Sequence, residues 1–243
     1  MHKSKIIIYG GNGFVGTHIA EQLVNLDCEV VCVSRTGKMP AQLKNIDWAQ
    51  KVAWLTGDAL QPDANLLTNT TAVVSLVGSL LLPTFSKQAY QQQLFINIQS
   101  NAALFDMVSK SSVQRLVVLG VHLPKLIQTE KFAYVKGKIM TEAALRDFVE
   151  ISQDHSAVIL KPTAIYGMRH TKNGKKINMA ALMAPLAKLQ SFMPSMIKRI
   201  LPETLVSVDA VAHAVINACF DQAYADKFTC LSNQKIIELA QKS

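Results

Sequence analysis

Cysteine is scarce in this chain of 243 residues, and no two of its four cysteines form a CxxC pair. The six histidines are scattered singly, so the ligand spacings of a metal site are missing. No apolar run reaches the length that a membrane-spanning helix needs. These absences predict free thiols, no metal site and no transmembrane span.

Acidic residues are absent between His155 and Pro202, although eight lysines and arginines lie in this segment. The rest of the chain has 25 − 8 = 17 basic residues against 17 acidic ones, so the segment carries the whole formal net charge of +8. A local excess predicts a local anionic partner. Three interpretations stay open for residues 155–202: a solvated basic face, a pocket for a long apolar substrate, and a docking surface for a membrane or a protein. Aromatic side chains that could stack on bases are sparse in this segment, with Phe192 near the basic cluster, so nucleic acid is not expected as a partner.

The first predicted strand begins within a few residues of Met1, which leaves no room for a targeting peptide. We therefore expect a cytoplasmic protein, or a mitochondrial matrix protein if the chain is already processed.

The start of the chain combines a strand, a tight turn and a helix. An apolar run at residues 6–9 leads directly into the glycine cluster at residues 10–16, and helical spacing of apolar residues follows at 17–24. A second strand-like run at 29–34 lies at the distance that a βαβ unit requires. Glycines let the backbone approach a diphosphate closely, and the free N–H groups of the helix's first turn face the anion. This pattern predicts a dinucleotide-binding turn.

The order of elements predicts an α/β fold with a doubly wound parallel sheet, a Rossmann fold, and a small C-terminal helical cap. Further strands are expected at about 52–55, 72–77, 115–119 and 157–161, and helices at about 89–109 and 132–153. Residues 1–165 would form the dinucleotide-binding domain, and residues 166–243 the cap and C-terminal elements packed on it. Within the latter we expect a loop at 166–177, a helix-prone segment at 178–201, a short strand at 205–208 and a final helix at 209–221.

Tyr134 and Lys138 are four residues apart in a predicted helix, so their side chains share one face. An ammonium beside a phenol favours the phenolate and lowers the tyrosine pKa. Such a tyrosine can exchange a proton with a carbonyl oxygen while a nicotinamide carries the hydride. We predict Tyr134 and Lys138 as the catalytic pair.

The end of the second strand bears on the choice of cofactor. Sites that take NAD usually place an acid there to accept hydrogen bonds from the ribose hydroxyls. This strand ends instead in Ser34-Arg35-Thr36-Gly37-Lys38, without an acid. The guanidinium of Arg35 can pair with a 2′-phosphate through two hydrogen bonds, so NADP is predicted and NAD is the alternative.

The chain resembles an extended or atypical short-chain dehydrogenase/reductase over nearly its whole length. Within this superfamily it is most similar to the coenzyme Q biosynthesis accessory proteins of mitochondria and to the nucleotide-binding accessory subunit of respiratory complex I. The resemblance rests on the following motifs: the glycine turn at 10–16, Gly57-Asp58, Asn97 at the opening of the fourth helix, Tyr134 with Lys138, and the stretches at 160–167 and 206–212.

The resemblance implies a role for each matching residue. Three glycines would form the pyrophosphate turn, with the residues between them in contact: Gly10, Gly13 and Gly16 with Asn12, Phe14 and Val15. The other implied contacts are Asp58 to the adenine, Gly78 to the ribose side, Lys138 to the nicotinamide ribose and Pro162 to the nicotinamide ring.

One position departs from the family pattern. Redox-active members usually have a serine or threonine at the end of the fifth strand, where this chain has Gly120. Our first hypothesis is an NADP-dependent oxidoreductase that acts on a small or lipophilic, quinone-like carbonyl. The alternative is a non-catalytic NADP(H)-binding accessory or assembly protein linked to ubiquinone or the respiratory chain, which Gly120 favours. The third is a sugar-nucleotide epimerase or dehydratase, for which the segment after the sixth strand is short.

Overall fold

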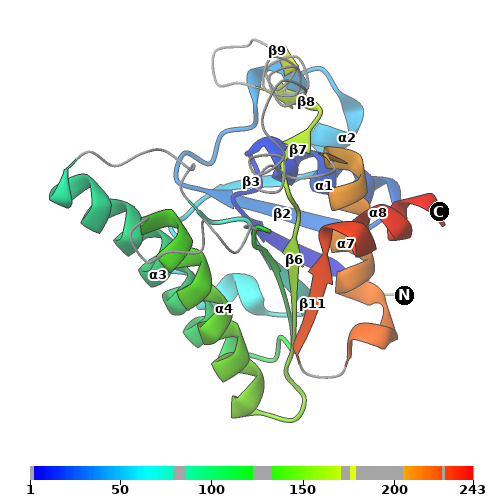
Figure 1. Ribbon diagram of the computed structural model, residues 1–243. Helices are drawn as coiled ribbons and strands as arrows, with labels where there is room; N and C mark the ends of the chain where they lie inside the picture. Colours follow the sequence, from blue (N-terminus) through cyan, green and yellow to red (C-terminus); the bar gives the residue numbers. More distant parts are fainter. Residues whose placement is uncertain are drawn as a thin grey trace.

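The computed structural model describes residues 3–78, 86–122, 133–170, 176–178, 205–225 and 228–242; for residues 89, 133, 134, 170, 176 and 177 it describes the backbone alone. Seven parallel strands form the central sheet, in the order β11-β6-β5-β4-β1-β2-β3 (Figure 1). Their bounds are β1 (Lys5–Tyr9), β2 (Glu29–Ser34), β3 (Ala53–Thr56), β4 (Thr70–Ser75), β5 (Arg115–Leu119), β6 (Ser156–Lys161) and β11 (Phe228–Ser232).

Helices cover both faces of the sheet (Figure 1). One face carries α1 (Phe14–Asn25), α7 (Val208–Phe220) and α8 (Asn233–Gln241), and the other carries α3 (Lys87–Ser109) and α4 (Ala133–Ile151). The other helices among the described residues are short: α2 (Asp47–Gln50) and the 3-10 turns Ala41–Leu43, Ala64–Leu67 and Gln222–Tyr224. The predicted doubly wound parallel sheet is confirmed.

Strand β1 shows why the strands are continuous apolar runs. Ile6 and Ile8 point into the cluster under α1 and α7, whereas Ile7 and Tyr9 point into the cluster under α3 and α4. All four side chains are buried. A central strand of a parallel sheet is covered on both faces, so apolar residues are needed at every position.

Three predictions about the elements are wrong. The helix predicted at 209–221 is not the last element, because β11 and α8 follow it and β11 pairs with β6 as an edge strand. The segment predicted as a loop at 166–177 contains the strands β8 (Met168–His170) and β9 (Lys176–Asn178), which pair antiparallel. Short antiparallel strands need only backbone hydrogen bonds, so the basic residues and glycines do not prevent them. Asn97, expected at the opening of a helix, lies well inside α3.

The C-terminal region contributes to the main sheet through β11, so residues beyond 165 complete it. A small parallel pair, β7 (Ile165–Tyr166) with β10 (Val206–Ser207), lies beside it. Nearly all of the helix-prone segment predicted at 178–201 lies outside the described residues, and the predicted division at residue 165 stays a prediction.

Arg115 ties the sheet to the end of a helix. It lies at the start of β5 and is only 9% exposed. Its Nε donates to Ser156 Oγ at 2.6 Å, and its Nη1 donates to the carbonyls of Ala218 at 2.8 Å and Asp221 at 3.3 Å. One buried guanidinium thus joins β5, β6 and the carboxyl end of α7, where backbone carbonyls lack helical partners.

Replacing Arg115 by Met should therefore lower the free energy of unfolding by about 3 kcal/mol, because buried carbonyls and a hydroxyl lose their donor. Urea denaturation followed by circular dichroism measures this change. The matched control is Lys110→Met, since Lys110 forms an exposed ion pair with Asp106, and its loss should cost less than about 0.5 kcal/mol. Equal effects of the two substitutions would contradict the role of Arg115.

Candidate functional site

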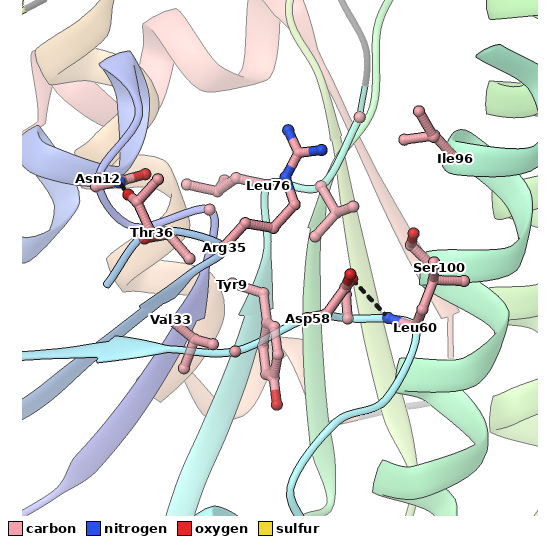
Figure 2. Close-up of a pocket in the computed structure, with 16 residues that line it drawn as sticks. Tyr9, Asn12, Val33, Arg35, Thr36, Asp58, Leu60, Leu76, Ile96 and Ser100 are labelled. Atoms are coloured by element: carbon pink, nitrogen blue, oxygen red, sulfur yellow. Dashed lines mark hydrogen bonds between the residues drawn. The ribbon is translucent and has the colours of Figure 1, made fainter. Parts of the chain in front are cut away.

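A cavity lies where the direction of the chain connections reverses across the sheet. From β1 the chain passes to α1 on one face, whereas from β4 it runs on to α3 on the other face. Open parallel sheets bind ligands at such a point, beyond the carboxyl ends of the strands. The cavity has a volume of about 450 Å³. Its lining residues include Gly10, Asn12, Arg35, Thr36, Asp58, Gly78 and Ser100 (Figure 2).

The glycine turn brings α1 into backbone contact with the end of β1. Gly10 has φ +86°, and a Cβ on Gly16 would lie 2.6 Å from the Cα and O of Gly11. Gly13 is the N-cap residue of α1, and no described side chain caps the helix. No described side chain therefore accepts hydrogen bonds from the N–H groups of the first turn, and the arrangement suits a diphosphate.

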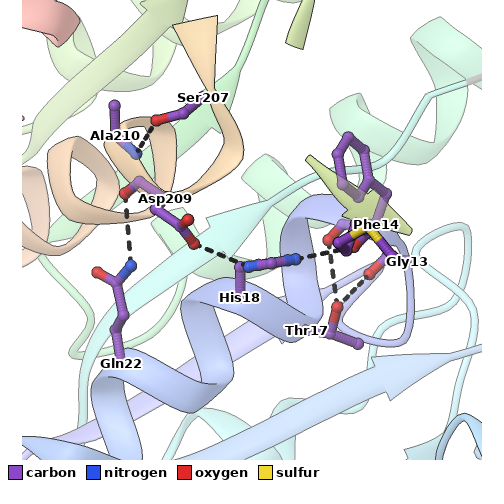
Figure 3. A network of polar contacts seen from close by, with 9 residues as sticks. Gly13, Phe14, Thr17, His18, Gln22, Ser207, Asp209 and Ala210 are labelled. Atoms are coloured by element: carbon purple, nitrogen blue, oxygen red, sulfur yellow. Dashed lines mark hydrogen bonds and ion pairs between the residues drawn. The ribbon is translucent and has the colours of Figure 1, made fainter. Parts of the chain in front are cut away.

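Polar contacts tie α1 to the C-terminal part of the chain (Figure 3). His18 Nδ1 contacts Asp209 Oδ1 at 2.9 Å, and His18 Nε2 contacts the carbonyl of Met168 at 3.1 Å. Gln22 Nε2 donates to the carbonyl of Asp209 at 3.4 Å. The helix behind the glycine turn is thereby tied to α7 and β8, which come from the C-terminal part of the chain.

The side chains of Arg35 and Asp58 lie on the same cavity, beyond the ends of β2 and β3 (Figure 2). The guanidinium of Arg35 makes no ion pair with any described residue. Asp58 Oδ1 accepts a hydrogen bond from Leu60 N at 3.0 Å, and it is the only acid that lines the cavity among the described residues. The rim at the end of β2 is therefore cationic, and the carboxylate lies one strand further along.

Lys138 approaches the cavity from α4. Its Nζ donates to the carbonyl of Leu119 at 3.0 Å and lies 3.2 Å from the place that a Cβ on Gly78 would occupy. Burial lowers the pKa of Lys138 to about 8. Because Gly78 has no side chain, the ammonium of Lys138 can lie beyond the end of β4, at the edge of the first cavity.

A second cavity, of about 280 Å³, lies on the other side of Lys138. Its walls come from the ends of β5 and β6 and from α4, and include Gly120, His122, Lys138, Glu142 and Lys161. A Cβ on Gly120 would lie 3.0 Å from two carbons of Ile159 and 3.1 Å from the carbonyl of Leu160. A serine at position 120 would fit only if these neighbours moved, and none of the described residues that line this cavity carries a hydroxyl.

The structure brings together some of the predicted site residues and separates others. Five line the first cavity: Gly10, Asn12, Arg35, Asp58 and Gly78. Of the others, Lys138 lines the second cavity, Val15 is buried in the core, and Pro162 accepts a hydrogen bond from His122 N at 2.8 Å. Gly13, Phe14 and Gly16 form the turn and the start of α1 without lining either cavity. Tyr134 lies in the first turn of α4, and its side chain lies outside the described residues.

Sequence reasoning missed an ion-pair cluster beside Lys138. Glu142 contacts Lys161 at 2.5 Å and Arg146 at 3.0 Å. Burial alone would raise the pKa of Glu142, but hydrogen bonds from Lys161 and Arg146 bring it below its usual value. Glu142 lies one helical turn after Lys138. This spacing in the sequence could have indicated that Glu142 lies on the same face of α4. The cluster joins α4 to the end of β6.

Tyr9 was also missed. It is 2% exposed, yet it contributes to the lining of the first cavity. Burial, with a smaller effect of Asp63, raises its pKa to about 12, and no described group bonds to its hydroxyl. The sequence could have indicated Tyr9 by its position directly before the glycine turn.

In the part of the chain that the structure describes, no three His, Cys, Asp or Glu side chains gather as metal ligands would. No described helix is both long and apolar enough to cross a bilayer. Much of the basic segment 155–202 lies outside the described residues, so its proposed membrane or protein partner stays a prediction.

The fold and the first cavity define a class: doubly wound α/β proteins with a glycine turn built for a nucleotide diphosphate. Comparison with known families refines this class. Residues 6–201 match the NAD dependent epimerase/dehydratase family, and the chain belongs to that family. The resemblance to extended short-chain dehydrogenases/reductases is thereby confirmed.

Proteins of a plant and of a yeast are among the relatives that are similar in sequence. An uncharacterized chloroplastic protein of Arabidopsis thaliana is 32% identical over 250 residues, covering 98% of this chain and 78% of that protein. MIOREX complex component 2 of Saccharomyces cerevisiae is 40% identical over 94 residues, covering 37% of this chain and 32% of that protein.

Solved structures share the fold at low identity. UDP-glucuronic acid 4-epimerase from Bacillus cereus, in complex with NAD, has a TM-score of 0.67 and 16% identity over 93% of this chain and 76% of that one. A short-chain dehydrogenase/reductase from Burkholderia thailandensis has a TM-score of 0.68 and 15% identity over 100% of this chain and 97% of that one.

The lowered pKa of Lys138 gives a pH dependence of stability with a definite sign. Between about pH 8 and the ordinary lysine value of 10.5, the unfolded chain holds this proton more tightly than the folded one, so the stability that the group contributes rises with pH. Lys138→Met removes this rise. Because Lys138 keeps some contact with solvent, we expect the free energy of unfolding of the wild type, minus that of the variant, to increase by about 1 kcal/mol from about pH 7.5 to about pH 9.5.

Urea titrations at several pH values measure this difference, and other titrating groups cancel in it. Lys51→Met serves as the control because Lys51 is exposed at the end of α2. A difference that stays flat for Lys138→Met, as we expect for the control, would show that the ammonium is solvated.

Proposed function

We propose that this chain is an NADP(H)-dependent oxidoreductase that acts on a small or lipophilic carbonyl compound. The observation that carries the cofactor choice is Arg35, a guanidinium without an ion pair among the described residues, on the cavity wall where NAD sites usually have an acid. A guanidinium matches a phosphate through two parallel charge-assisted hydrogen bonds.

Several described residues support the binding of a dinucleotide. The glycine turn and the start of α1 would hold the diphosphate, and Asp58 would accept a hydrogen bond from the adenine. Lys138, whose ammonium lies beside Gly78, would donate to the nicotinamide ribose. When bound, the nicotinamide supplies or accepts the hydride.

The residues that would transfer a proton lie on α4. Tyr134 precedes Lys138 by one helical turn, so the helix carries both on one side. The ammonium of Lys138, charged below about pH 8, would stabilise a phenolate on Tyr134. The Tyr134 hydroxyl would give its proton to the carbonyl oxygen during reduction and take one from the alcohol during oxidation.

A second candidate is a non-catalytic NADP(H)-binding accessory protein linked to ubiquinone or respiratory-chain function. The specific observation that favours it is Gly120, where the packing of Ile159 and the Leu160 carbonyl leaves little room for a hydroxyl. Bound NADP(H) would then act by stabilising the native state alone. The sugar-nucleotide alternative agrees with the solved epimerases, whose 15–18% identity supports the fold and no substrate.

The localisation, in the cytoplasm or the mitochondrial matrix, is also a proposal. One relative is a chloroplastic protein.

Arg35→Leu tests the cofactor choice. We expect the Kd for NADPH to rise at least about tenfold, with the Kd for NADH changed less than about twofold, because only the 2′-phosphate loses its partner. Titration calorimetry measures both constants. Lys51→Met, which removes one positive charge from an exposed helix end, is the control for long-range electrostatics and should leave the NADPH-to-NADH ratio unchanged. A wild type that binds NADH as tightly as NADPH would reject the NADP assignment.

Tyr134→Phe tests turnover. Oxidation of NADPH, followed at 340 nm with a panel of small ketones, aldehydes and quinones, should fall at least about a hundredfold while NADPH affinity stays within about twofold. Tyr224→Phe is the matched control, because Tyr224 is buried in the 3-10 turn after α7 and lines neither cavity. A wild type that binds NADPH tightly and oxidises it with no member of the panel would favour the accessory protein.

A further inference from the structure

Positive charge outweighs negative charge around the second cavity. Glu142 is the one acid among the described residues that line it, and both of its oxygens are engaged. Oε1 contacts Arg146 Nη2 at 3.0 Å, and Oε2 contacts Lys161 Nζ at 2.5 Å. Two cations thus share one carboxylate, and Lys138 lines the same cavity. A cavity whose walls carry mainly one sign of charge concentrates ions of the opposite sign, so this one favours an anion.

The rest of the described lining is apolar and encloses little space. Val121, Ile139 and Ile159 line the cavity together with Gly120. Its volume of about 280 Å³ lies just below the range of roughly 300–1,000 Å³ that is usual for drug-sized ligands. As the described residues bound it, the cavity therefore suits a small molecule with an apolar body and one charged end.

The two lysines of the cavity come from different elements that meet at the end of β5. Gly120 N donates to the carbonyl of Leu160 at 2.7 Å, so Gly120 lies beside the end of β6, where Lys161 follows Leu160. Lys138 reaches the same place from α4 and donates to the carbonyl of Leu119 at 3.0 Å. A small molecule in this cavity can therefore contact both lysines, with one end near each.

We propose that the second cavity binds a substrate that carries a carboxylate, and that Lys161 is the residue that binds this carboxylate. This inference rests on the proposed oxidoreductase function and narrows its substrate class to small oxo acids, whose carbonyl end would lie towards Lys138. An ammonium has three hydrogens to donate, so Lys161 can keep its contact with Glu142 and also bind a second carboxylate. Hydrogen bonds between an ammonium and a carboxylate are charge-assisted and therefore strong.

A purely structural role for Lys161 makes a different prediction. Its contact with Glu142 joins β6 to α4, and the loss of this contact could change the shape of the cavity. In that case charged and neutral molecules of the same shape would all bind more weakly by the same factor. If Lys161 binds a carboxylate, its loss weakens the charged molecule alone. The ratio of two dissociation constants separates these cases.

The probes are benzoate and benzamide, which have nearly the same shape and differ in charge. Titrations followed by ¹H–¹⁵N NMR at pH 7 give both dissociation constants, and the selectivity is the Kd of benzamide divided by that of benzoate. We expect the amide signal of Gly120 to shift with both probes, and the wild type to be at least about tenfold selective for benzoate.

Lys161→Gln should lower this selectivity about tenfold, the loss of a hydrogen bond between charged groups. Lys161→Arg keeps the charge and should keep the selectivity within about threefold of the wild type. The matched control is Lys110→Gln, which removes the same charge from an exposed ion pair with Asp106 and should leave the selectivity unchanged.

Turnover tests the substrate class with 4-formylbenzoate and 4-formylbenzamide, by oxidation of NADPH at 340 nm. We expect kcat/KM to be about tenfold higher for the acid, and Lys161→Gln to remove this preference through KM rather than kcat, because the carboxylate lies away from the reacting carbonyl.

A wild type without selectivity for benzoate, or unchanged selectivity in Lys161→Gln, would overturn the inference. Turnover of neutral aldehydes with NADPH would then leave the proposed function standing. Selectivity that depends on Lys161, with NADPH bound but neither aldehyde reduced, would keep the carboxylate site and overturn both its role in substrate binding and the proposed function.

Discussion

The close approach of α1 to the glycine turn is the constraint on which the rest of the site depends. A Cβ at Gly16 would overlap the backbone of Gly11, so this helix can begin against the turn only if no side chain intervenes. The contact places the first N–H groups of α1 at the carboxyl edge of the sheet, beside the glycine turn. His18 lies further along α1, and its two ring nitrogens contact Asp209 of α7 and Met168 of β8 (Figure 3). An early segment of the chain is thereby locked to a late one.

A second close approach positions Lys138. A Cβ on Gly137 would lie 2.7 Å from Asn97 Cβ, so α4 packs directly against α3 at the residue before Lys138. Thr141 Oγ1 donates to the carbonyl of Asn97 at 3.3 Å, which strengthens the same junction. The lysine side chain then reaches past Gly78 to the carbonyl of Leu119 and lies between the two cavities. Small residues at helix contacts thus decide where the ammonium is placed.

The two ends of the cleft differ in how closely they follow the family pattern. The end formed by β1, β2 and β3 has the glycine turn, a cationic rim and one carboxylate, which are the groups that a phosphorylated adenosine requires. The end formed by β5, β6 and α4 keeps the lysine but has Gly120 in place of a hydroxyl, beside the ion pairs of Glu142. The residues suited to binding the adenosine part of a nucleotide are therefore separate from the residues suited to catalysis.

The sequence alone determined the parallel sheet, its central strands and the glycine turn, because local patterns produce these features: apolar runs covered on both faces, and glycines between a strand and a helix. It also indicated three residues that line the two cavities, Arg35, Asp58 and Lys138. It did not reveal β11, although Phe228, Thr229 and Cys230 favour a strand, because an edge strand of five residues carries too weak a signal without its partner β6. Only the tertiary structure decided that Asn12 contacts Thr36, that Lys138 lies beside Gly78, and that Glu142 pairs with Lys161. These pairs are far apart in the chain, and their distances are set by how the strands are ordered and how the helices pack, which no local pattern encodes.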